Sequence, residues 1–262
     1  MLFCIDLGNT NITLGLYEGD DLRGHWRIST DHHRMPDEYG ILMVSVLGHA
    51  GFGPGDVTGI CMCSVVPPLT GVLDESCRAY FGRAPLIIDA NVKTDVTIRY
   101  DNPLEVGADR VVDAAAVFKL YGAPACIVDF GTATTFDAIS REGDYLGGAI
   151  APGIGIAAEA LFSRTCKLPR IDLVRPPGAI GRNTVHSMQA GLLFGYVGLV
   201  EGMVARFRRE LGDDMRVIGT GGLVEIIARE TDVIQEIDPW LTLRGLRILW
   251  DLNCTKGMRD ER

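Results

Sequence analysis

Residues 126–148, CIVDFGTATTFDAISREGDYLGG, decide the fold because they repeat residues 3–24, FCIDLGNTNITLGLYEGDDLRG. In both copies an Asp lies at the end of a buried strand, a Gly and polar residues turn the chain, and a second strand leads to an acidic-glycine turn. Asp129 aligns with Asp6 at an offset of 123 residues (129 − 6). Two related halves explain this match better than coincidence, so we predict an α/β fold of two similar domains.

The sequence around each copy predicts a meander of strands followed by alternating helices and strands. In the first half we predict strands at residues 2–6, 11–18, 21–29, 57–66 and 85–89, and helices at residues 37–52, 67–82 and 107–122. In the second half we predict a strand from Ala123, the repeated hairpin, strands at residues 215–219 and 233–237, and helices at residues 152–164, at residues 183–211, after Gly222 and from Leu241. We place the domain boundary after residue 118, which gives domains 1–118 and 119–262. Residues 256–262 are expected to fray.

Composition is typical of a globular enzyme, with 262 residues, 47% hydrophobic and 23% charged. Lys and Arg number 25 against 34 Asp and Glu, and the net charge of −9 repels nucleic acid. The N-terminus has no basic leader and no long uncharged apolar run occurs, so we expect a cytoplasmic protein without a membrane segment. The seven cysteines form no CxxC pair and are interpreted as core residues, and the five histidines lack metal-ligand spacing.

The turns that follow Asp6 and Asp129 offer backbone N–H groups, hydroxyls and a small Gly where a phosphate can approach. An ordinary hairpin turn, or an Asp that caps it, is the alternative for each turn alone. Because the turn occurs in both halves, we expect the two copies to face each other across an interdomain cleft. Two carboxylates repel a phosphate ligand, so we predict that Mg²⁺ intervenes, with Asp6 bound to it directly or through water.

Two further glycine clusters were considered. Gly219, Gly221 and Gly222 follow a strand and precede a helix, where missing side chains let the flat ring of a cofactor lie against the backbone. Gly153 opens a degenerate dinucleotide-like motif, which we interpret as packing at a helix start because it follows a hairpin. No GxxxxGK[ST] loop is present, which excludes a Walker-type phosphate site.

Asp109 lies where a polar loop enters a helix, in the sequence GADR of residues 107–110. The helix dipole favours its ionised form, so it is a candidate proton acceptor. An ordinary N-terminal helix cap is the alternative. Arg110 beside it has the geometry to bind a substrate carboxylate or a surface acid.

DLGNTNITLG, GADR, DFGTATTFD, GGAIAPG, GTGGL and LTLRGL occur in an order that closely resembles the type III pantothenate kinases over nearly the whole chain. The resemblance implies a duplicated ribonuclease-H-like fold, also found in acetate and sugar kinases, Hsp70 and actin. It further implies transfer of the γ-phosphoryl group of ATP to the terminal hydroxyl of pantothenate. Potassium or ammonium is expected at Asp129, besides the Mg²⁺ that accompanies ATP.

The resemblance also assigns roles to individual residues. The nucleotide phosphates would contact Asp6, Leu7, Gly8, Asn9, Thr10, Asn11, Ile12, Thr13 and, on the second turn, Thr132. Asp109 would be the general base. Pantothenate would lie against Tyr100, Gly107, Ala108, Asp109 and Arg110, with Thr184 contributed by the second subunit of a homodimer.

Three other functions are compatible with parts of the sequence. A related kinase would phosphorylate a sugar or a short acid, but Tyr100 and Arg110 favour pantothenate. A non-catalytic paralogue would act as an accessory regulator of transcription, which the intact Asp109 and Asp129 and the acidic charge disfavour. A dinucleotide-dependent oxidoreductase, raised by Gly153, ranks third. The apolar helix at residues 183–211 suits a homodimer interface and an intradomain core nearly equally.

Overall fold

The computed structural model describes residues 1–254, which divide into two compact units. The first unit comprises residues 1–96, 102–116 and those from 242 onward, and the second comprises residues 97–101 and 117–241. The C-terminal helix therefore packs with the first unit, and the boundary after residue 118 stays a prediction about the duplicated halves. The expected fraying of residues 256–262 lies outside the described residues.

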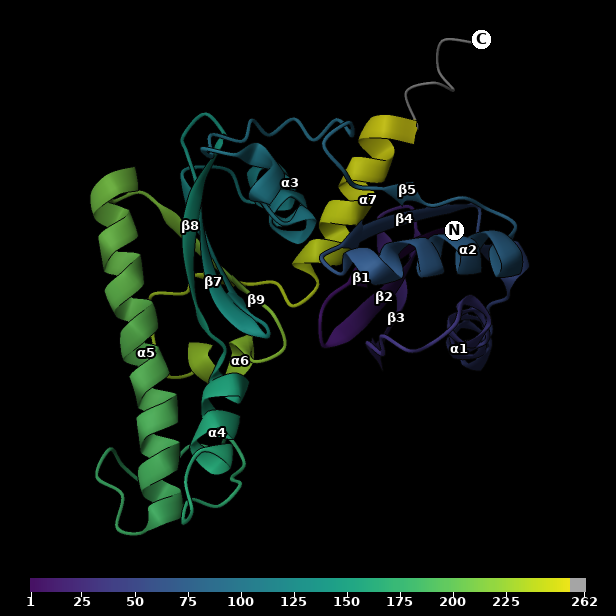
Figure 1. Ribbon diagram of the computed structural model, residues 1–262. Helices are drawn as coiled ribbons and strands as arrows, with labels where there is room; N and C mark the ends of the chain where they lie inside the picture. Colours follow the sequence, from purple (N-terminus) through teal and green to yellow (C-terminus); the bar gives the residue numbers. More distant parts are fainter. Residues whose placement is uncertain (255–262) are drawn as a thin grey trace. The chain divides into compact units, whose positions relative to one another are not determined.

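The first unit is built on a five-stranded sheet of order β3-β2-β1-β4-β5 (Figure 1). Its strands are β1 (Leu2–Leu7), β2 (Asn11–Glu18), β3 (Asp21–Ser29), β4 (Gly59–Ser64) and β5 (Leu86–Ile87). Its helices are α1 (Pro36–His49), α2 (Pro67–Phe81), most of α3 (Ala108–Leu120), α7 (Leu241–Cys254), and the short 3-10 turns η1 (Pro54–Asp56) and η2 (Pro103–Glu105). β1, β2 and β3 are antiparallel, whereas β4 and β5 add in parallel.

The second unit repeats this topology, with strand order β10-β9-β6-β7-β8. Its strands are β6 (Ala125–Phe130), β7 (Ala133–Ile139), β8 (Tyr145–Pro152), β9 (Arg216–Thr220) and β10 (Glu236–Ile237), and its helices are α4 (Ile154–Ser163), α5 (Thr184–Leu211) and α6 (Val224–Ala228). β6, β7 and β8 form the antiparallel meander, and β9 and β10 add in parallel. This confirms the predicted duplicated ribonuclease-H-like α/β fold and each predicted helix and strand.

Helices cover both faces of the first sheet and at least one face of the second. In the first unit Phe3, Ile5 and Leu7 alternate into a core shared with α1 and α2. The opposite face packs on α7, where Leu243 lies over Gly15 and Trp250 over Gly59. In the second unit the buried face of β6 and β7 packs on α5. The sheet faces are thus covered, and the polar ends of the strands carry the candidate site residues.

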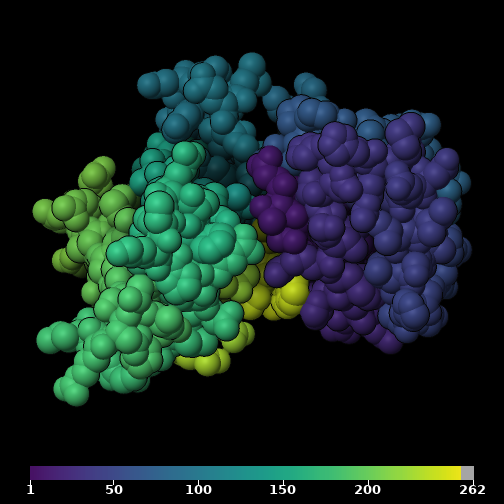
Figure 2. Space-filling view, turned by 60° about the horizontal axis from the view of Figure 1, so that its bottom comes forward, coloured from purple at the N-terminus to yellow at the C-terminus, as the bar shows by residue number. Residues whose placement is uncertain are grey.

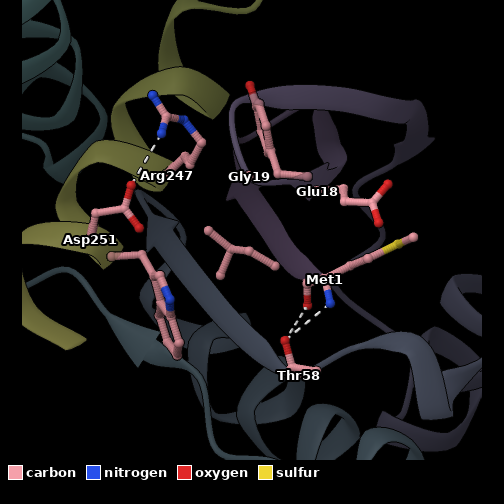
Figure 3. A pocket seen from close by; sticks show the side chains of 9 residues that line it. Met1, Glu18, Gly19, Thr58, Arg247 and Asp251 are labelled. Atoms are coloured by element: carbon pink, nitrogen blue, oxygen red, sulfur yellow. Dashed lines mark hydrogen bonds and ion pairs between the residues drawn. The ribbon is translucent and has the colours of Figure 1, made fainter. Parts of the chain in front are cut away.

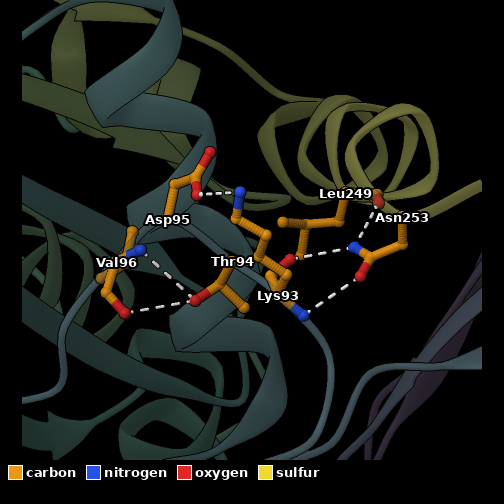
Figure 4. A network of polar contacts seen from close by, with 6 residues as sticks. All are labelled: Lys93, Thr94, Asp95, Val96, Leu249 and Asn253. Atoms are coloured by element: carbon orange, nitrogen blue, oxygen red, sulfur yellow. Dashed lines mark hydrogen bonds and ion pairs between the residues drawn. The ribbon is translucent and has the colours of Figure 1, made fainter. Parts of the chain in front are cut away.

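A polar network fixes the segment after β5 to α7 in the first unit (Figure 4). The Asn253 side chain accepts a hydrogen bond from Lys93 N at 3.1 Å and donates to the Lys93 carbonyl at 2.9 Å. The same amide donates to the Leu249 carbonyl at 2.8 Å. Residues 160 positions apart in sequence cannot be paired from local patterns, which is why the sequence did not assign α7 to the first unit.

The cysteine prediction is correct for five residues and wrong for one. Cys4, Cys61, Cys63, Cys77 and Cys126 are buried, as expected for reduced thiols in a core. Cys166 is exposed, in the segment between α4 and α5, and Cys254 is half-buried. That segment, residues 164–183, is coloured green in Figure 2 and has no regular secondary structure. Its Ile171 and Leu173 nevertheless pack against the core of the second unit. The core interpretation fails at Cys166 because no helix or strand there faces a core.

Candidate functional site

The first polar turn joins β1 to β2 and is braced from β3. Gly8 N–H donates to the Asn11 carbonyl at 3.1 Å, and the Gly8 carbonyl accepts a hydrogen bond from Thr30 Oγ1 at 2.6 Å. Thr30 N–H also donates to the Thr10 carbonyl at 3.0 Å. With its carbonyls occupied, the turn exposes Asn9, Thr10 and Asn11. This rigid loop of small and polar residues is suited to phosphate. Thr30 supports the loop, and no local sequence pattern identified it.

Asp6 lies on β1 immediately before this turn. Burial, together with the negative charge of Asp109, raises the pKa of its carboxyl to about 7. A hydrogen bond from the Cys63 thiol to Asp6 Oδ1 (3.5 Å) and the charge of Arg27 lower it in part. The charge of Asp109 opposes the ionisation of Asp6, and a cation bound at Asp6 would offset this repulsion.

Asp109 lies in the first turn of α3, and the neighbouring glycine makes room for it. A Cβ on Gly107 would lie 2.5 Å from Asp109 Oδ1 and 3.4 Å from Val65 Cγ1. Asp109 Oδ1 accepts a hydrogen bond from Arg110 N–H at 2.8 Å, and because α3 begins at Ala108, Asp109 lies inside the helix and is not its N-cap. Burial nevertheless raises the pKa of Asp109 above its ordinary value, against the lowering effect of Arg110. The position at the start of a helix predicted only the helix dipole, which favours the ionised carboxylate. It did not predict the burial, which raises the pKa.

Cys63 is a site contact that sequence reasoning assigned only to the core. It is the parallel-strand partner of Asp6 across β1 and β4. The equivalent register in the second unit pairs Asp129 with Thr220. Both contacts follow from strand pairing, so the duplicated topology, once known, would have identified them.

The second turn is one residue shorter than the first, because Leu7 pairs with Ile12 whereas Phe130 pairs with Thr134. Gly153 N–H, at the start of α4, donates to the Thr132 carbonyl at 3.1 Å. A side chain on Gly153 would collide with the carbonyls of the turn. This confirms Gly153 as a helix-start packing residue.

Asp129 lies at the equivalent position of Asp6, on β6. Gly221 has a φ of +91°, and a Cβ there would collide with Asp129 Oδ1, so only glycine permits this approach. The space beside Gly219 is filled by Val224 and Ile234 in the core under α6. Gly221 therefore makes room for the Asp129 carboxylate, and Gly219 makes room for packed core side chains. Contact of these glycines with a cofactor stays a prediction.

The structure groups the predicted residues within each unit. In the first unit it brings together Asp6 and Asp109, with Gly107 and Arg110 adjacent to Asp109. In the second unit Asp129 and Thr132 belong to one turn, Tyr100 packs beside β8, and Thr184 is exposed at the start of α5. Use of both groups by one ligand stays a prediction.

A separate cavity of about 270 Å³ lies in the first unit (Figure 3). Its lining includes Met1, Glu18, Arg247, Trp250 and Asp251, and none of the predicted site residues. Arg247 is already paired with Asp251 at 3.1 Å. Within residues 1–254, no group of three or more His, Cys, Asp or Glu side chains is arranged to hold a metal, so a cation at Asp6 would also need ligands from its substrate.

Comparison with known proteins identifies the family. A family model described as type III pantothenate kinase matches residues 2–206. The type III pantothenate kinase of Moorella thermoacetica is 52% identical over 253 residues, covering 97% of this chain and 100% of the relative. That of Geobacter sulfurreducens is 53% identical over 253 residues, covering 97% of this chain and 99% of the relative.

Solved structures agree on the fold. A Campylobacter jejuni protein assigned to the Baf family of transcriptional activators superposes with a TM-score of 0.63 at 18% identity, over 95% of this chain and 98% of that chain. At this identity the likeness concerns the fold alone. The family match, the sequence relatives and the paired turns together lead to one conclusion: this chain belongs to the type III pantothenate kinase family.

Proposed function

We propose that this protein transfers the γ-phosphoryl group of ATP to the terminal hydroxyl of pantothenate and forms 4′-phosphopantothenate, the first step toward coenzyme A. The observation that carries the proposal is the half-buried pair of carboxyl groups of Asp6 and Asp109, next to a braced polar turn, in a chain of this family. A bond forms between the pantothenate oxygen and the γ-phosphorus, and the bond to the bridging oxygen of ADP breaks. The hydroxyl proton passes to Asp109.

The residues present fit a metal-bound nucleotide. The charge of Asp109 makes ionisation of Asp6 unfavourable, which Mg²⁺ bound at Asp6, directly or through water, would offset. When bound, Mg²⁺ would neutralise part of the negative charge on the phosphates. The backbone and side chains from Asp6 through Thr13, together with Thr132, Gly219, Gly221 and Gly222, are the proposed nucleotide contacts.

Asp109 is the proposed general base. Its raised pKa makes it a better proton acceptor than an ordinary carboxylate. Gly107 and the Arg110 N–H fix the position of Oδ1, so the base is held before the substrate arrives. Tyr100, Gly107, Ala108 and Arg110 would hold pantothenate in line with the γ-phosphorus.

Replacing potassium with sodium should lower the rate. We propose that Asp129, held against Gly221, binds a potassium or ammonium ion that complements the nucleotide phosphates. Turnover measured in potassium, ammonium and sodium chloride at equal ionic strength should fall in sodium, and Asp129→Asn should be slow in all three. Equal rates in all three salts for the native protein would contradict a selective site at Asp129.

We also propose a homodimer in which α5 contributes to both the core and the interface. Leu192, Leu193, Val197 and Val200 are buried, whereas Gly191, Gly195 and Gly198 face open space on the other side of the helix. Small residues permit close helix approach, and the exposed Ile180, at 89%, precedes the helix start where Thr184 would reach the partner's site.

Gly195→Leu should produce monomers. Leu is a better helix former than Gly by roughly 1 kcal/mol, so the variant should fold while its side chain blocks close approach. Gly71→Leu, on an exposed face of α2 with equally open space, is the matched control. Analytical ultracentrifugation at micromolar concentration should show a native dimer, a dimeric control and a monomeric Gly195 variant with reduced activity. A dimeric Gly195 variant would exclude this interface.

The remaining proposals concern location and partners. We propose that the protein acts in the cytoplasm and binds neither nucleic acid nor membrane. Helix α5 is long and apolar enough to cross a membrane by composition, but 44% of that stretch is buried within the protein, as in core helices. The net charge of −9 opposes nucleic acid.

A substrate panel tests the proposed function. The purified protein with ATP, Mg²⁺ and potassium should release ADP rapidly with pantothenate and only at background level with hexoses, acetate or no acceptor. Rapid ADP release with a sugar instead would assign a related small-molecule kinase. The absence of turnover with every acceptor would favour a non-catalytic regulator.

A further inference from the structure

The last Asp of the DFGTATTFD motif, Asp137, has no role in the phosphoryl transfer described above. It lies on β7 and is 2% exposed. Its Oδ1 accepts a hydrogen bond from Tyr145 Oη at 2.8 Å, and its Oδ2 accepts one from Thr135 Oγ1 at 3.2 Å. A carboxylate this deeply buried is costly unless its hydrogen bonds are made, so the contact fixes the Tyr145 ring, which is itself fully buried.

Tyr145 in turn holds the segment that carries Tyr100. Arg99 N–H donates to the Tyr145 carbonyl at 2.8 Å, and Tyr145 N–H donates to the Thr97 carbonyl at 2.9 Å. These bonds attach residues 97–101 to β8 as a short parallel bridge at Ile98. The attachment joins the backbone of the segment to the same residue whose ring is fixed by Asp137.

The two tyrosine rings are in direct contact. Their centroids lie 6.4 Å apart with an interplanar angle of 48°, a favourable tilted geometry. The Tyr100 ring also covers Gly147, where φ is +115° and a Cβ would lie 3.1 Å from Tyr100 Cε2. The register of β7 and β8 shifts between Ala138 and Ile139, beside this contact. Such bulges often change the direction in which a side chain points.

We propose that Asp137 and Tyr145 are positioning residues for the acceptor substrate: Asp137 fixes Tyr145, and Tyr145 with Gly147 holds the Tyr100 ring in the orientation that meets pantothenate. The inference rests on the proposed contact between Tyr100 and pantothenate. Tyr100 remains 37% exposed, so part of its ring is available to a ligand while the rest is packed.

Tyr145→Phe tests the proposal, because it keeps the ring and removes only the hydroxyl. We expect the KM for pantothenate to rise roughly tenfold while kcat and the KM for ATP stay within about twofold of the native values. Tyr80→Phe is the matched control, since it removes a tyrosine–aspartate hydrogen bond of 3.0 Å on the exposed surface of the first unit. Calorimetric titration with pantothenate should show the same loss of affinity.

A double-mutant cycle separates positioning from general structural damage. Tyr100→Ala should itself raise the KM for pantothenate, and in that background Tyr145→Phe should have almost no further effect. An undiminished effect of Tyr145→Phe in that background would overturn the proposal, as would a native KM in Tyr145→Phe alone. A native KM in Tyr100→Ala would instead contradict the Tyr100 contact in the proposed function, and the inference with it.

Asp137→Asn provides a second route if Tyr145→Phe folds poorly. An amide has nearly the same shape and can still accept one hydrogen bond from Tyr145, so we expect a smaller rise in the pantothenate KM of the same selectivity. Equal losses for pantothenate and ATP in this variant would assign Asp137 to stability and overturn its positioning role.

Discussion

Asp109→Asn should fold normally and lose about 10²- to 10⁴-fold in kcat. The amide keeps the shape of the carboxylate and its hydrogen bond from Arg110 N–H, but it cannot accept the proton of the substrate hydroxyl. Because the native carboxyl is buried at a cost, removing its charge should not destabilise the protein. The KM for pantothenate should change little, since Asn retains polar contacts to a hydroxyl.

Steady-state kinetics and a melting curve check this prediction. Asp37→Asn is the matched control, because Asp37 also lies in the first turn of a helix, α1, and is exposed. The control should keep native kcat. An Asp109→Asn enzyme with near-native kcat would remove Asp109 from the role of base, and one that fails to fold would point to a structural role of this side chain as its main function.

Asp6→Asn should abolish most activity and at the same time stabilise the ligand-free protein. Loss of the carboxylate should weaken the interaction with Mg²⁺ and the nucleotide, and kcat/KM should fall by about 10²-fold or more. The stabilisation follows from the pKa of Asp6, which burial and Asp109 raise to about 7. The folded state therefore binds the proton of Asp6 more tightly than the unfolded state does. The stability that the native protein has at low pH is lost as pH rises from the ordinary pKa of an Asp through about 7.

The stabilising effect of Asp6→Asn should grow as pH rises. Asn mimics the protonated carboxyl at every pH, so the Tm of Asp6→Asn should exceed that of the native protein by more at about pH 8 than at about pH 5, by the equivalent of roughly 1–3 kcal/mol. Asp21→Asn, an exposed carboxylate at the start of β3, should show no such difference. A Tm difference that shrinks with rising pH would contradict the electrostatic description of the pair.

Local sequence signals predicted the elements because hairpin turns, helix caps and hydrophobic periodicity act over a few residues. The repeat between Asp6 and Asp129 predicted the duplication, and the structure gives both residues the same strand position. Asn183 as the start of the long helix is confirmed, since its side chain accepts a hydrogen bond from His186 N–H at 2.8 Å.

Features that depend on distant pairing could not be predicted. The thiol contact of Cys63 with Asp6 follows from the register of β1 and β4, 57 residues apart. The raised pKa of Asp109 depends on burial, which a helix-cap pattern does not report. The link from Asp137 through Tyr145 to Tyr100 needs three segments in place at once, and the sequence showed only that Asp137 belonged to a specific motif.

The most direct test of the central claim is the mass of the product formed from pantothenate by the native protein and by Asp109→Asn, with ATP, Mg²⁺ and potassium present. We predict that the native protein yields pantothenate carrying one added phosphoryl group, and that the variant yields almost none. Release of ADP without phosphorylated pantothenate, or equal product from both proteins, would contradict the account.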